Sequence, residues 1–201
     1  MPQKAFFNLP LSKKQHIIDA SYDVFLEKEY EKVAILDITT RANIPVGSFY
    51  QYFKNKDDLY LYLLRELESR ILSSLYNNEE KDLLGWNEYI IGKHLTEKEK
   101  AFENTWYRVP ESVVQKFYFE KENLKFFEEF YKNKFNEICR KNFLKENISK
   151  DFAMYLFITS TFNIYMYCRY RNITDPKKIE EVKKLFVTEV LPYGIFKSNN
   201  S

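Results

Sequence analysis

The scarcity of residues that break helices is the feature that most constrains this chain. Its 201 residues include only 4 Gly and 6 Pro, and these are scattered along the sequence. So few breakers favour long helices over a sheet of many strands. Hydrophobic residues make up 45% of the chain and aromatic residues 18%, which is enough apolar surface for a real core. We therefore expect an all-α protein.

Charge and composition exclude several classes of protein. The formal net charge of +2 is too small to indicate nucleic-acid binding on its own. Cys139 and Cys168 form no CxxC pair, and His16 and His94 lie far apart, so we expect reduced thiols and no metal site. The N-terminus has no leader pattern, and no later stretch holds 18 apolar residues free of charge. We expect a soluble cytoplasmic protein with no cofactor and no membrane partner.

The N-terminal region has the pattern of four helices. A first amphipathic helix is expected to begin with Ser12 as its cap and to end near Tyr30. Asn43 suits a left-handed turn after the second helix, and Pro45 suits the first position of the third. The last three helices are expected over residues 35–42, 45–52 and 57–75. Two short helices joined by a tight turn are typical of a helix-turn-helix.

The third of these helices carries the side chains expected to meet DNA. It begins with three small residues that allow a close approach to base edges in the major groove: Val46, Gly47 and Ser48. Groups that reach phosphates or base edges follow on Tyr50, Gln51, Tyr52 and Lys56. Phe49 and Phe53 lie four residues apart and share a face, so we expect both to pack back on the first helix.

The stretch ILDITTRANIPVGSFYQYFKNKDDL, residues 35–59, resembles the TetR/AcrR family of regulators. The resemblance covers about residues 12–70 and rests on a small-residue helix start and on a finish in which Tyr50, Phe53, Lys56 and Leu59 follow at intervals of three. It implies that Val46, Gly47, Ser48 and Gln51 lie near bases, and that Tyr50, Tyr52 and Lys56 lie near phosphates.

One departure from the family pattern concerns the second helix. The family often has Thr at its start, where the hydroxyl and the backbone amide hold a phosphate, whereas this chain has Val33 and Ala34. The amides of Ile35 and Leu36 can still hold a phosphate at the helix N-terminus. We expect weaker binding rather than none.

The rest of the chain reads as further helices. They are expected over residues 83–95, 96–109, 110–144 (two helices), 149–170 and 175–190, with caps at Thr96, Ser149 and Asp175. On the last helix the apolar side chains expected to face inward are Ile179, Val182, Leu185, Phe186 and Val190. The helix at 149–170 is apolar on nearly every side, so it has to be covered all round. In the resembling family the last two helices form a four-helix bundle with their twofold mates, and we expect a homodimer through residues 149–170 and 175–190.

Aromatic residues in the middle of the chain either line a ligand cavity or form solid core. The candidates for an apolar or aromatic effector site are Trp86, Tyr89, Trp106, Phe117, Phe127, Tyr131 and Tyr155. The resulting division is a helix-turn-helix DNA-binding domain, residues 1–56, joined by a long helix to a helical effector-binding and dimerisation domain, residues 57–201.

These patterns predict a ligand-responsive dimeric transcriptional regulator, a repressor by the commoner family behaviour. It would bind a pseudo-palindromic operator on double-stranded DNA and be released by a small-molecule effector. No set of nucleophile, base and orienting group stands out, so we expect no enzyme and no catalytic residues. The alternative is a dimeric ligand- or protein-binding module whose helix-turn-helix has lost its DNA affinity, which the Val33–Ala34 departure and the near-neutral N-terminal charge favour.

Overall fold

A computed structural model describes residues 2–76, 95–120, 132, 136 and 144–190. The regular elements among these residues are helices, which confirms the predicted all-α class. The chain divides into two compact units: unit 1 holds Met1–Ile71 and Leu95–Val113, and unit 2 holds Leu72–His94 and Val114–Ser201. The predicted boundary between residues 56 and 57 falls inside unit 1, and as a functional division it stays a prediction.

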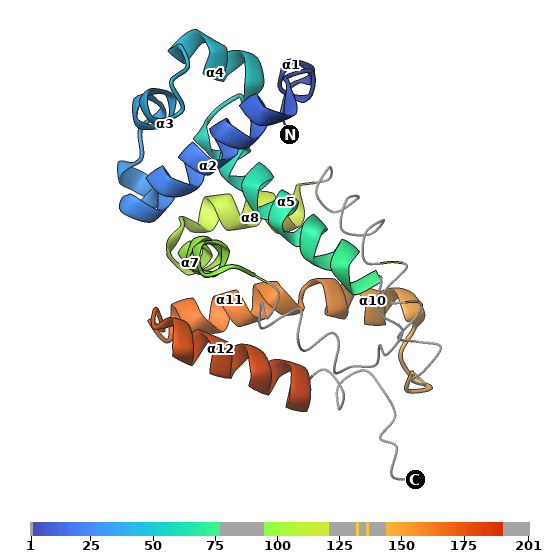
Figure 1. Cartoon of the computed structure of the whole chain (residues 1–201). Helices are drawn as coiled ribbons and strands as arrows, with labels where there is room; N and C mark the ends of the chain where they lie inside the picture. The colour runs from blue at the N-terminus through green and yellow to red at the C-terminus, as the bar shows by residue number, and fades with distance from the viewer. Residues whose placement is uncertain (1, 77–94, 121–131, 133–135, 137–143, 191–201) are drawn as a thin grey trace. The chain divides into compact units, whose positions relative to one another are not determined.

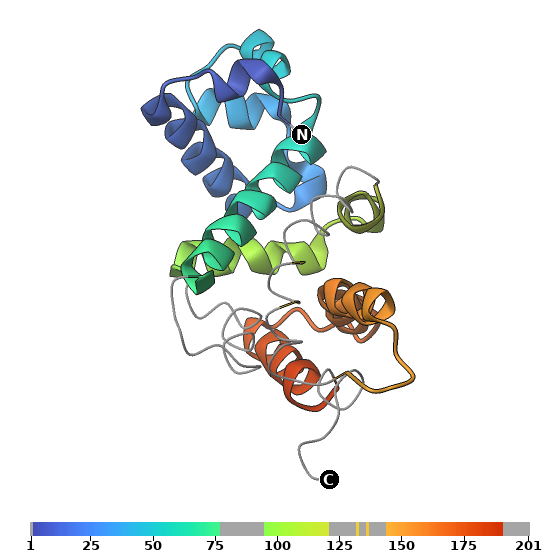
Figure 2. The ribbon, with the colours of Figure 1, turned by 90° about the vertical axis from the view of Figure 1, so that its right-hand side faces the viewer.

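Unit 1 contains the N-terminal helices and one segment from later in the chain. Helices α1 to α4 gather around the first part of α5 (Figures 1 and 2). The elements are α1 (Lys4–Phe7), α2 (Leu11–Glu27), the 3-10 helix η1 (Tyr30–Lys32), α3 (Ile35–Arg41), α4 (Val46–Tyr52), α5 (Lys56–Tyr76), α7 (Glu97–Thr105) and the 3-10 helix η2 (Trp106–Arg108). By its residue range, α5 begins in unit 1 and ends in unit 2.

The predicted helix-turn-helix is present as α3, the turn at Asn43, and α4. Asn43 has a φ of 48°, the left-handed conformation expected of the turn. Pro45 is the cap that precedes α4, one position earlier than predicted. α2 begins before its predicted cap at Ser12, because the carbonyl of Pro10 already accepts hydrogen bonds from the amides of Lys13 and Lys14, each at 3.0 Å.

Helix α1 was not expected from the sequence. It has 4 residues, far fewer than an isolated helix needs to be stable in water. Its ring at Phe6 is fully buried. Contacts with other helices therefore stabilise α1. The sequence around it shows no helical periodicity for this reason.

An aromatic cluster joins α2, α5 and α7 in the core of unit 1. The ring of Tyr60 lies 5.0 Å from that of Phe25 and 5.2 Å from that of Phe102 between centroids. Its phenol oxygen is 2.7 Å from the hydroxyl of Thr105. Tyr22 adds an edge-to-face contact with Phe102 at 4.6 Å. This cluster ties a segment from beyond residue 95 to the helices that carry the helix-turn-helix.

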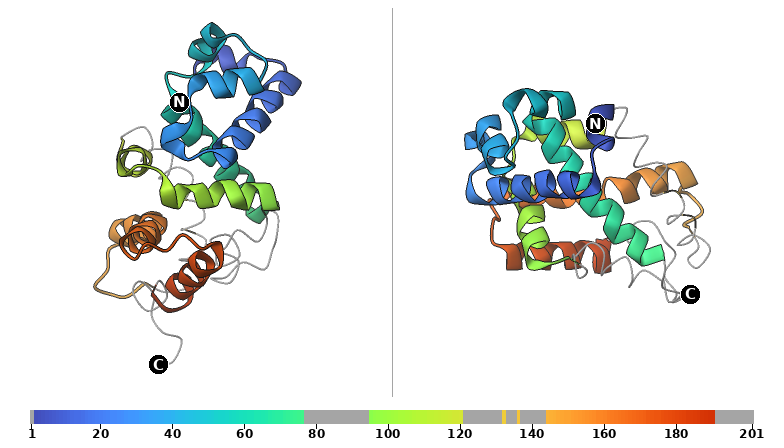
Figure 3. Two further views of the ribbon diagram at one scale, coloured as in Figure 1. Left: turned by 90° about the vertical axis from the view of Figure 1, so that its left-hand side faces the viewer. Right: turned by 45° about the horizontal axis from the view of Figure 1, so that its top comes forward.

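Unit 2 contains the C-terminal helices. α8 (Glu111–Phe119) begins in unit 1 by its residue range, and α10 (Lys150–Ile158), α11 (Ser160–Tyr170), α12 (Pro176–Leu185) and the π-helix η3 (Phe186–Val190) follow. α11 and α12 lie side by side (Figures 1 and 3). Ile164, Tyr165 and Cys168 of α11 are buried, as is Ile179 of α12. Burial raises the pKa of the Cys168 thiol.

The helix caps predicted at Thr96, Ser149 and Asp175 are confirmed. The hydroxyl of Ser149 accepts a hydrogen bond from the amide of Phe152 at 3.2 Å. The carboxylate of Asp175 accepts one from the amide of Lys177 at 3.0 Å. In unit 1, the carboxylate of Glu99 accepts a bond from the amide of Thr96 at 2.9 Å, and the hydroxyl of Thr96 accepts one from the amide of Glu99 at 3.3 Å, which completes the predicted capping box.

Two expectations for the C-terminal helices are wrong. The residues expected to form one helix over 149–170 form two, α10 and α11, with Thr159 between them. The carbonyl of Tyr155 accepts bonds there from both the amide of Thr159, at 3.0 Å, and its hydroxyl, at 2.9 Å. Leu185 and Val190 were expected to face inward but are exposed. Leu185 comes six residues after buried Ile179, which places it about 120° away around a helix of 3.6 residues per turn.

The helices predicted over 83–95 and most of 121–144 lie outside the described residues. None of the helices that the structure describes has both the length and the apolar character needed to cross a membrane.

Candidate nucleic-acid interface

Helix α4 has one buried and one exposed face. Phe49, and Phe53 just beyond the helix, are fully buried, and their predicted packing on the first amphipathic helix stays a prediction. Val46, Gly47 and Gln51 are exposed, Tyr50 is 51% exposed, and Ser48 is partly exposed. The side chains predicted to approach bases therefore lie together on one side of a short helix, which is the arrangement that enters a major groove.

Gly47 leaves open space on the exposed face of α4. A Cβ built on Gly47 would have no other atom within 4 Å. A glycine inside a helix is less favourable than alanine by about 1 kcal/mol. Packing within the chain therefore does not require glycine at this position. The missing side chain leaves open space in front of the helix, which allows another molecule to come close to its backbone.

Tyr52 lies differently from the prediction. Its side chain was expected on the surface near phosphates, but it is only 6% exposed. Its ring lies 6.0 Å from the ring of Phe6 in α1, and this contact with an unpredicted helix explains its burial. A phosphate contact by Tyr52 stays a prediction.

Lys56 also lies differently from the prediction, because its ammonium group is bonded inside unit 1. It donates to the carbonyl oxygens of Tyr30 at 2.7 Å, Val33 at 2.9 Å and Glu31 at 3.3 Å. Its nitrogen also lies 4.7 Å from the centre of the Tyr30 ring. An ammonium group has three hydrogens to donate, and here each has an acceptor. Lys56 therefore links η1 to the start of α5, and its contact with a phosphate stays a prediction.

The link between η1 and α5 has a second part. The phenol of Tyr30 donates a hydrogen bond to the carboxylate of Asp57. Burial, followed by this bond, raises the pKa of the Tyr30 phenol. At the start of α5 the side chain of Asn55 accepts a bond from the amide of Asp58 at 2.9 Å, and caps the helix. The segment after α4 is thus fixed to the segment before α3.

The N-terminus of α3 is the predicted phosphate contact through the amides of Ile35 and Leu36. Amides in a first helical turn have no acceptor within their own helix. Leu36 is exposed there, and Ile35 is partly exposed. The nearby carboxylate of Asp37 accepts a bond from the amide of Ala34 at 2.9 Å and pairs with Lys28 at 2.7 Å. A phosphate at this end of α3 would meet a carboxylate that is already neutralised by a lysine.

Ion pairs hold α3 against the end of α2. Arg41 lies 2.7 Å from the carboxylate of Glu27, and the hydrogen bond from Arg41 lowers the pKa of Glu27. The hydrogen bond from Lys28, and then that from the amide of Ala34, lower the pKa of Asp37. The hydroxyl of Thr39, which is buried, donates to the carbonyl of Leu36 at 3.2 Å, so this buried hydroxyl has an acceptor.

The predicted effector-site aromatics are only partly described. Trp106 is buried in unit 1, where its ring stacks at 6.5 Å from that of Tyr60. Phe117 is buried and Tyr155 is half exposed, both in unit 2. Trp86, Tyr89, Phe127 and Tyr131 lie outside the described residues. The lining of an effector cavity by these residues stays a prediction.

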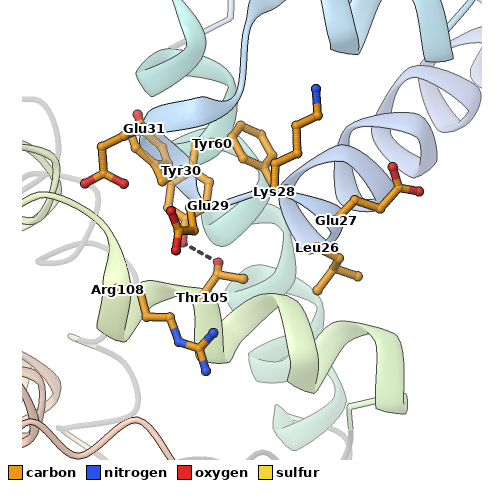
Figure 4. Close-up of a pocket in the computed structure, with 10 residues that line it drawn as sticks. Leu26, Glu27, Lys28, Glu29, Tyr30, Glu31, Tyr60, Thr105 and Arg108 are labelled. Carbon is orange, nitrogen blue, oxygen red and sulfur yellow. Dashed lines mark hydrogen bonds between the residues drawn. The ribbon is translucent and has the colours of Figure 1, made fainter.

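A hollow of about 500 Å³ lies within unit 1, between the end of α2, η1 and the α7–η2 segment (Figure 4). Its walls include the carboxylates of Glu29 and Glu31, the guanidinium of Arg108, and the bonded pair of Tyr60 and Thr105. Of the aromatic residues predicted for an effector site, the three that the structure describes, Trp106, Phe117 and Tyr155, do not line it. The described residues contain no group of three or more His, Cys, Asp or Glu placed to hold a metal ion.

The N-terminal residues that form the helix-turn-helix are similar to known proteins in sequence. Residues 17–63 match the family model described as bacterial regulatory proteins, tetR family. The HTH-type transcriptional repressor DhaR of Mycobacterium sp. (strain GP1) is 34% identical over 67 residues, which are 33% of this chain and 34% of that protein. The chain thus spans about a third of the length of the curated relatives that it matches.

Two solved structures extend the likeness in fold to most of the chain. SmeT, the repressor of the Stenotrophomonas maltophilia multidrug efflux pump SmeDEF, has a TM-score of 0.58 at 14% identity and covers 92% of this chain and 91% of its own. FadR from Bacillus subtilis in complex with stearoyl-CoA has a TM-score of 0.54 at 19% identity and covers 87% and 97%. These likenesses confirm the predicted fold, a helix-turn-helix followed by a helical C-terminal region.

Proposed function

We propose that this chain, whose residues 17–63 match the model of the tetR family of bacterial regulatory proteins, is a dimeric transcriptional repressor released from its operator by a small apolar or aromatic effector. The observation that carries the proposal is the exposed face of α4. It presents Val46, Gly47 and Gln51 to solvent, and a Cβ on Gly47 would meet nothing within the chain. A helix that begins with small residues can approach the bases in the major groove closely.

In this proposal, some residues of α4 contact bases and others contact phosphates. Gln51 reads a base edge, because an amide can donate to and accept from adenine at once. Val46, Gly47 and Ser48 let the helix approach the bases. Tyr50, together with the first amides of α3 at Ile35 and Leu36, holds phosphates and sets the register.

The chain pairs with a second copy through its C-terminal helices. Apolar side chains on these helices are exposed in the single chain, including Phe152 and Tyr155 of α10, Tyr167 and Tyr170 of α11, and Leu185 of α12. Large apolar side chains exposed on a single chain mark a candidate interaction site. A twofold dimer would place two α4 helices to read half-sites about 34 Å apart, one turn of DNA.

The effector acts through α5. This helix starts at the Lys56 and Asp57 links to η1 and, by its residue range, continues into unit 2. An effector that binds the C-terminal region more tightly in one state than in another shifts α5, and with it the spacing of the two α4 helices. The FadR structure in complex with stearoyl-CoA suggests an acyl-CoA as the first ligand to test.

The salt dependence of DNA binding tests the proposal against a module that has lost its DNA affinity. We expect the purified protein to bind a random-sequence duplex, with an affinity that falls steeply as salt rises, because binding releases counterions from the phosphates. Fluorescence anisotropy of a labelled duplex measures this. Absence of binding at low salt, from protein shown to be folded, would favour the degenerate module.

Linkage between the two ligands tests the proposed mechanism. Stearoyl-CoA should lower the affinity for the operator, and the operator should lower the affinity for stearoyl-CoA by the same factor. Isothermal titration of the protein with stearoyl-CoA, alone and in complex with the operator, measures both. Equal affinities for stearoyl-CoA with and without DNA would contradict control of DNA binding by this ligand.

A further inference from the structure

The first residues of the chain are bonded to the end of α4, although they precede the segment that matches the family model at residues 17–63. The backbone amide of Gln3 donates to the carbonyl of Tyr52 at 2.8 Å. The side-chain amide of Gln3 donates to the carbonyl of Tyr50, also at 2.8 Å. One residue therefore supplies two hydrogen bonds to the last turn of the helix proposed to read DNA.

These two carbonyls need partners from outside their helix. The last four carbonyls of any α-helix have no amide within it to bond. α4 has 7 residues, so these four make up more than half of its length. A helix this short is not stable by itself and depends on contacts with its surroundings. The bonds from Gln3 thus act where α4 most needs support.

Phe6 connects the same turn to the long helix. Its ring is fully buried and lies 4.8 Å from the ring of Phe53 and 5.4 Å from that of Tyr62 in α5. Phe53 directly follows α4, and its amide bonds the carbonyl of Phe49 at 2.8 Å. The short helix α1 is therefore the piece that joins the C-terminal turn of α4 to the first turns of α5 (Figures 1 and 2).

We infer that residues 2–7 form an N-terminal clasp that positions the DNA-reading face of α4, with Gln3 and Phe6 as its positioning residues. The inference rests on the proposed function, because it assigns the clasp a role in sequence recognition. Tyr50 and Gln51 lie in the turn that the clasp holds. A frayed last turn misplaces the side chain that reads a base, whereas attraction between lysines and phosphates does not depend on that geometry. The clasp therefore acts on discrimination between sequences more than on binding to any DNA.

A matched pair of variants in the full chain tests the clasp. Gln3→Met removes the side-chain donor without changing charge or length. Gln15→Met makes the same exchange at an exposed position in α2, where the amide donates to Asp19 in its own helix, at 3.0 Å. The probes are a duplex enriched by the wild-type protein from a random pool and a scrambled duplex of equal length. Affinities for both come from anisotropy.

Gln3→Met is expected to lower the ratio of the two affinities about fivefold, the size of one neutral hydrogen bond, while Gln15→Met leaves it within about twofold. The affinity for the scrambled duplex should stay unchanged in both. An unchanged ratio in Gln3→Met, or an equal loss on both duplexes, would overturn the role in discrimination.

Hydrogen exchange of the free protein tests the clasp without DNA. The amide of Phe53 should exchange faster in Gln3→Met than in the wild type or in Gln15→Met, because the turn it closes has lost a support. Equal exchange in all three proteins would overturn the clasp itself. If the wild-type protein enriches no duplex, the proposed function fails, and the role of the clasp in discrimination fails with it. Exchange at Phe53 then reports only whether Gln3 holds the turn.

Discussion

At the scale of single residues, Gly47 is where stability and DNA binding favour different side chains. Gly47→Ala should raise the free energy of unfolding by about 0.5–1 kcal/mol, because alanine is the better helix former and its methyl group meets no other atom within 4 Å. The same methyl group stands between α4 and the bases. The affinity for the operator should fall about tenfold, the size of one base contact. Urea unfolding and anisotropy measure the two effects, and a variant that loses stability or binds DNA as well as the wild type contradicts this account of Gly47.

Lys56 should matter for the stability of unit 1. Lys56→Met keeps the aliphatic chain but leaves the carbonyls of Tyr30, Glu31 and Val33 without the ammonium group. We expect the free energy of unfolding to fall by about 1–3 kcal/mol, the cost of unsatisfied partly buried acceptors. Lys54→Met, the same exchange at an exposed position two residues earlier, should change it by less than about 0.5 kcal/mol. Equal effects in urea unfolding would show that the bonds of Lys56 add nothing.

The sequence predicts these residues to different extents for a physical reason. The exposure of Gly47 and Gln51 follows from helical periodicity, which is local. The bonds of Lys56 reach residues 23 to 26 positions earlier in the chain, and no local pattern carries that information. Tyr52 was expected to be exposed, but Phe6 covers it. Phe6 belongs to α1, a helix for which the sequence has no local signal.

At the scale of elements, helices with a strong cap could be predicted and those made by tertiary contact could not. α4 and α12 begin within one residue of their predicted starts, because Pro45 and Pro176 restrict the backbone and Asp175 caps α12. α1 has no such signal and is held by Gln3 and Phe6. The division between α10 and α11 at Thr159 carries no local signal of this kind, because both a continuous and a divided helix fit the sequence there.

The start of α3 should respond to acid through Asp37. The pKa of this carboxyl is lowered in the folded protein, first by Lys28 and then by the amide of Ala34. A lowered folded pKa means that the carboxylate stabilises the fold above its unfolded pKa, near 3.9, and that this contribution is lost as the pH falls through the folded value. Asp37→Asn should therefore be less stable than the wild type at pH 7, and the difference should shrink as the pH falls below about 4.

Urea unfolding of both proteins across that range measures the difference due to Asp37. In a Lys28→Met background, which lacks the largest cause of the shift, the pH dependence of the difference should be smaller. A difference that is constant from pH 7 to pH 3 would show that the charge of Asp37 does not stabilise α3.

At the scale of the whole molecule, the proposed dimer can be tested with two exposed leucines. Leu185 at the end of α12 is 60% exposed, and Leu11 at the start of α2 is 78% exposed. Leu185→Glu places a charge in the proposed interface and should convert the dimer to monomers, because a carboxylate buried there without a partner is costly. Leu11→Glu makes the same exchange away from it and should leave the dimer intact. Sedimentation velocity distinguishes the outcomes, and a wild-type monomer would contradict the dimer directly.

The central claim is that the exposed face of α4 reads a twofold-symmetric DNA sequence, and selection from a random duplex pool tests it most directly. The wild-type protein should enrich an inverted repeat with half-sites about one turn apart. Gln51→Ala should enrich a repeat that has lost its preference at one position in each half-site, by about 1–3 kcal/mol. No enriched sequence from folded, dimeric wild-type protein would contradict the claim, and an unchanged repeat with Gln51→Ala would remove Gln51 from base recognition.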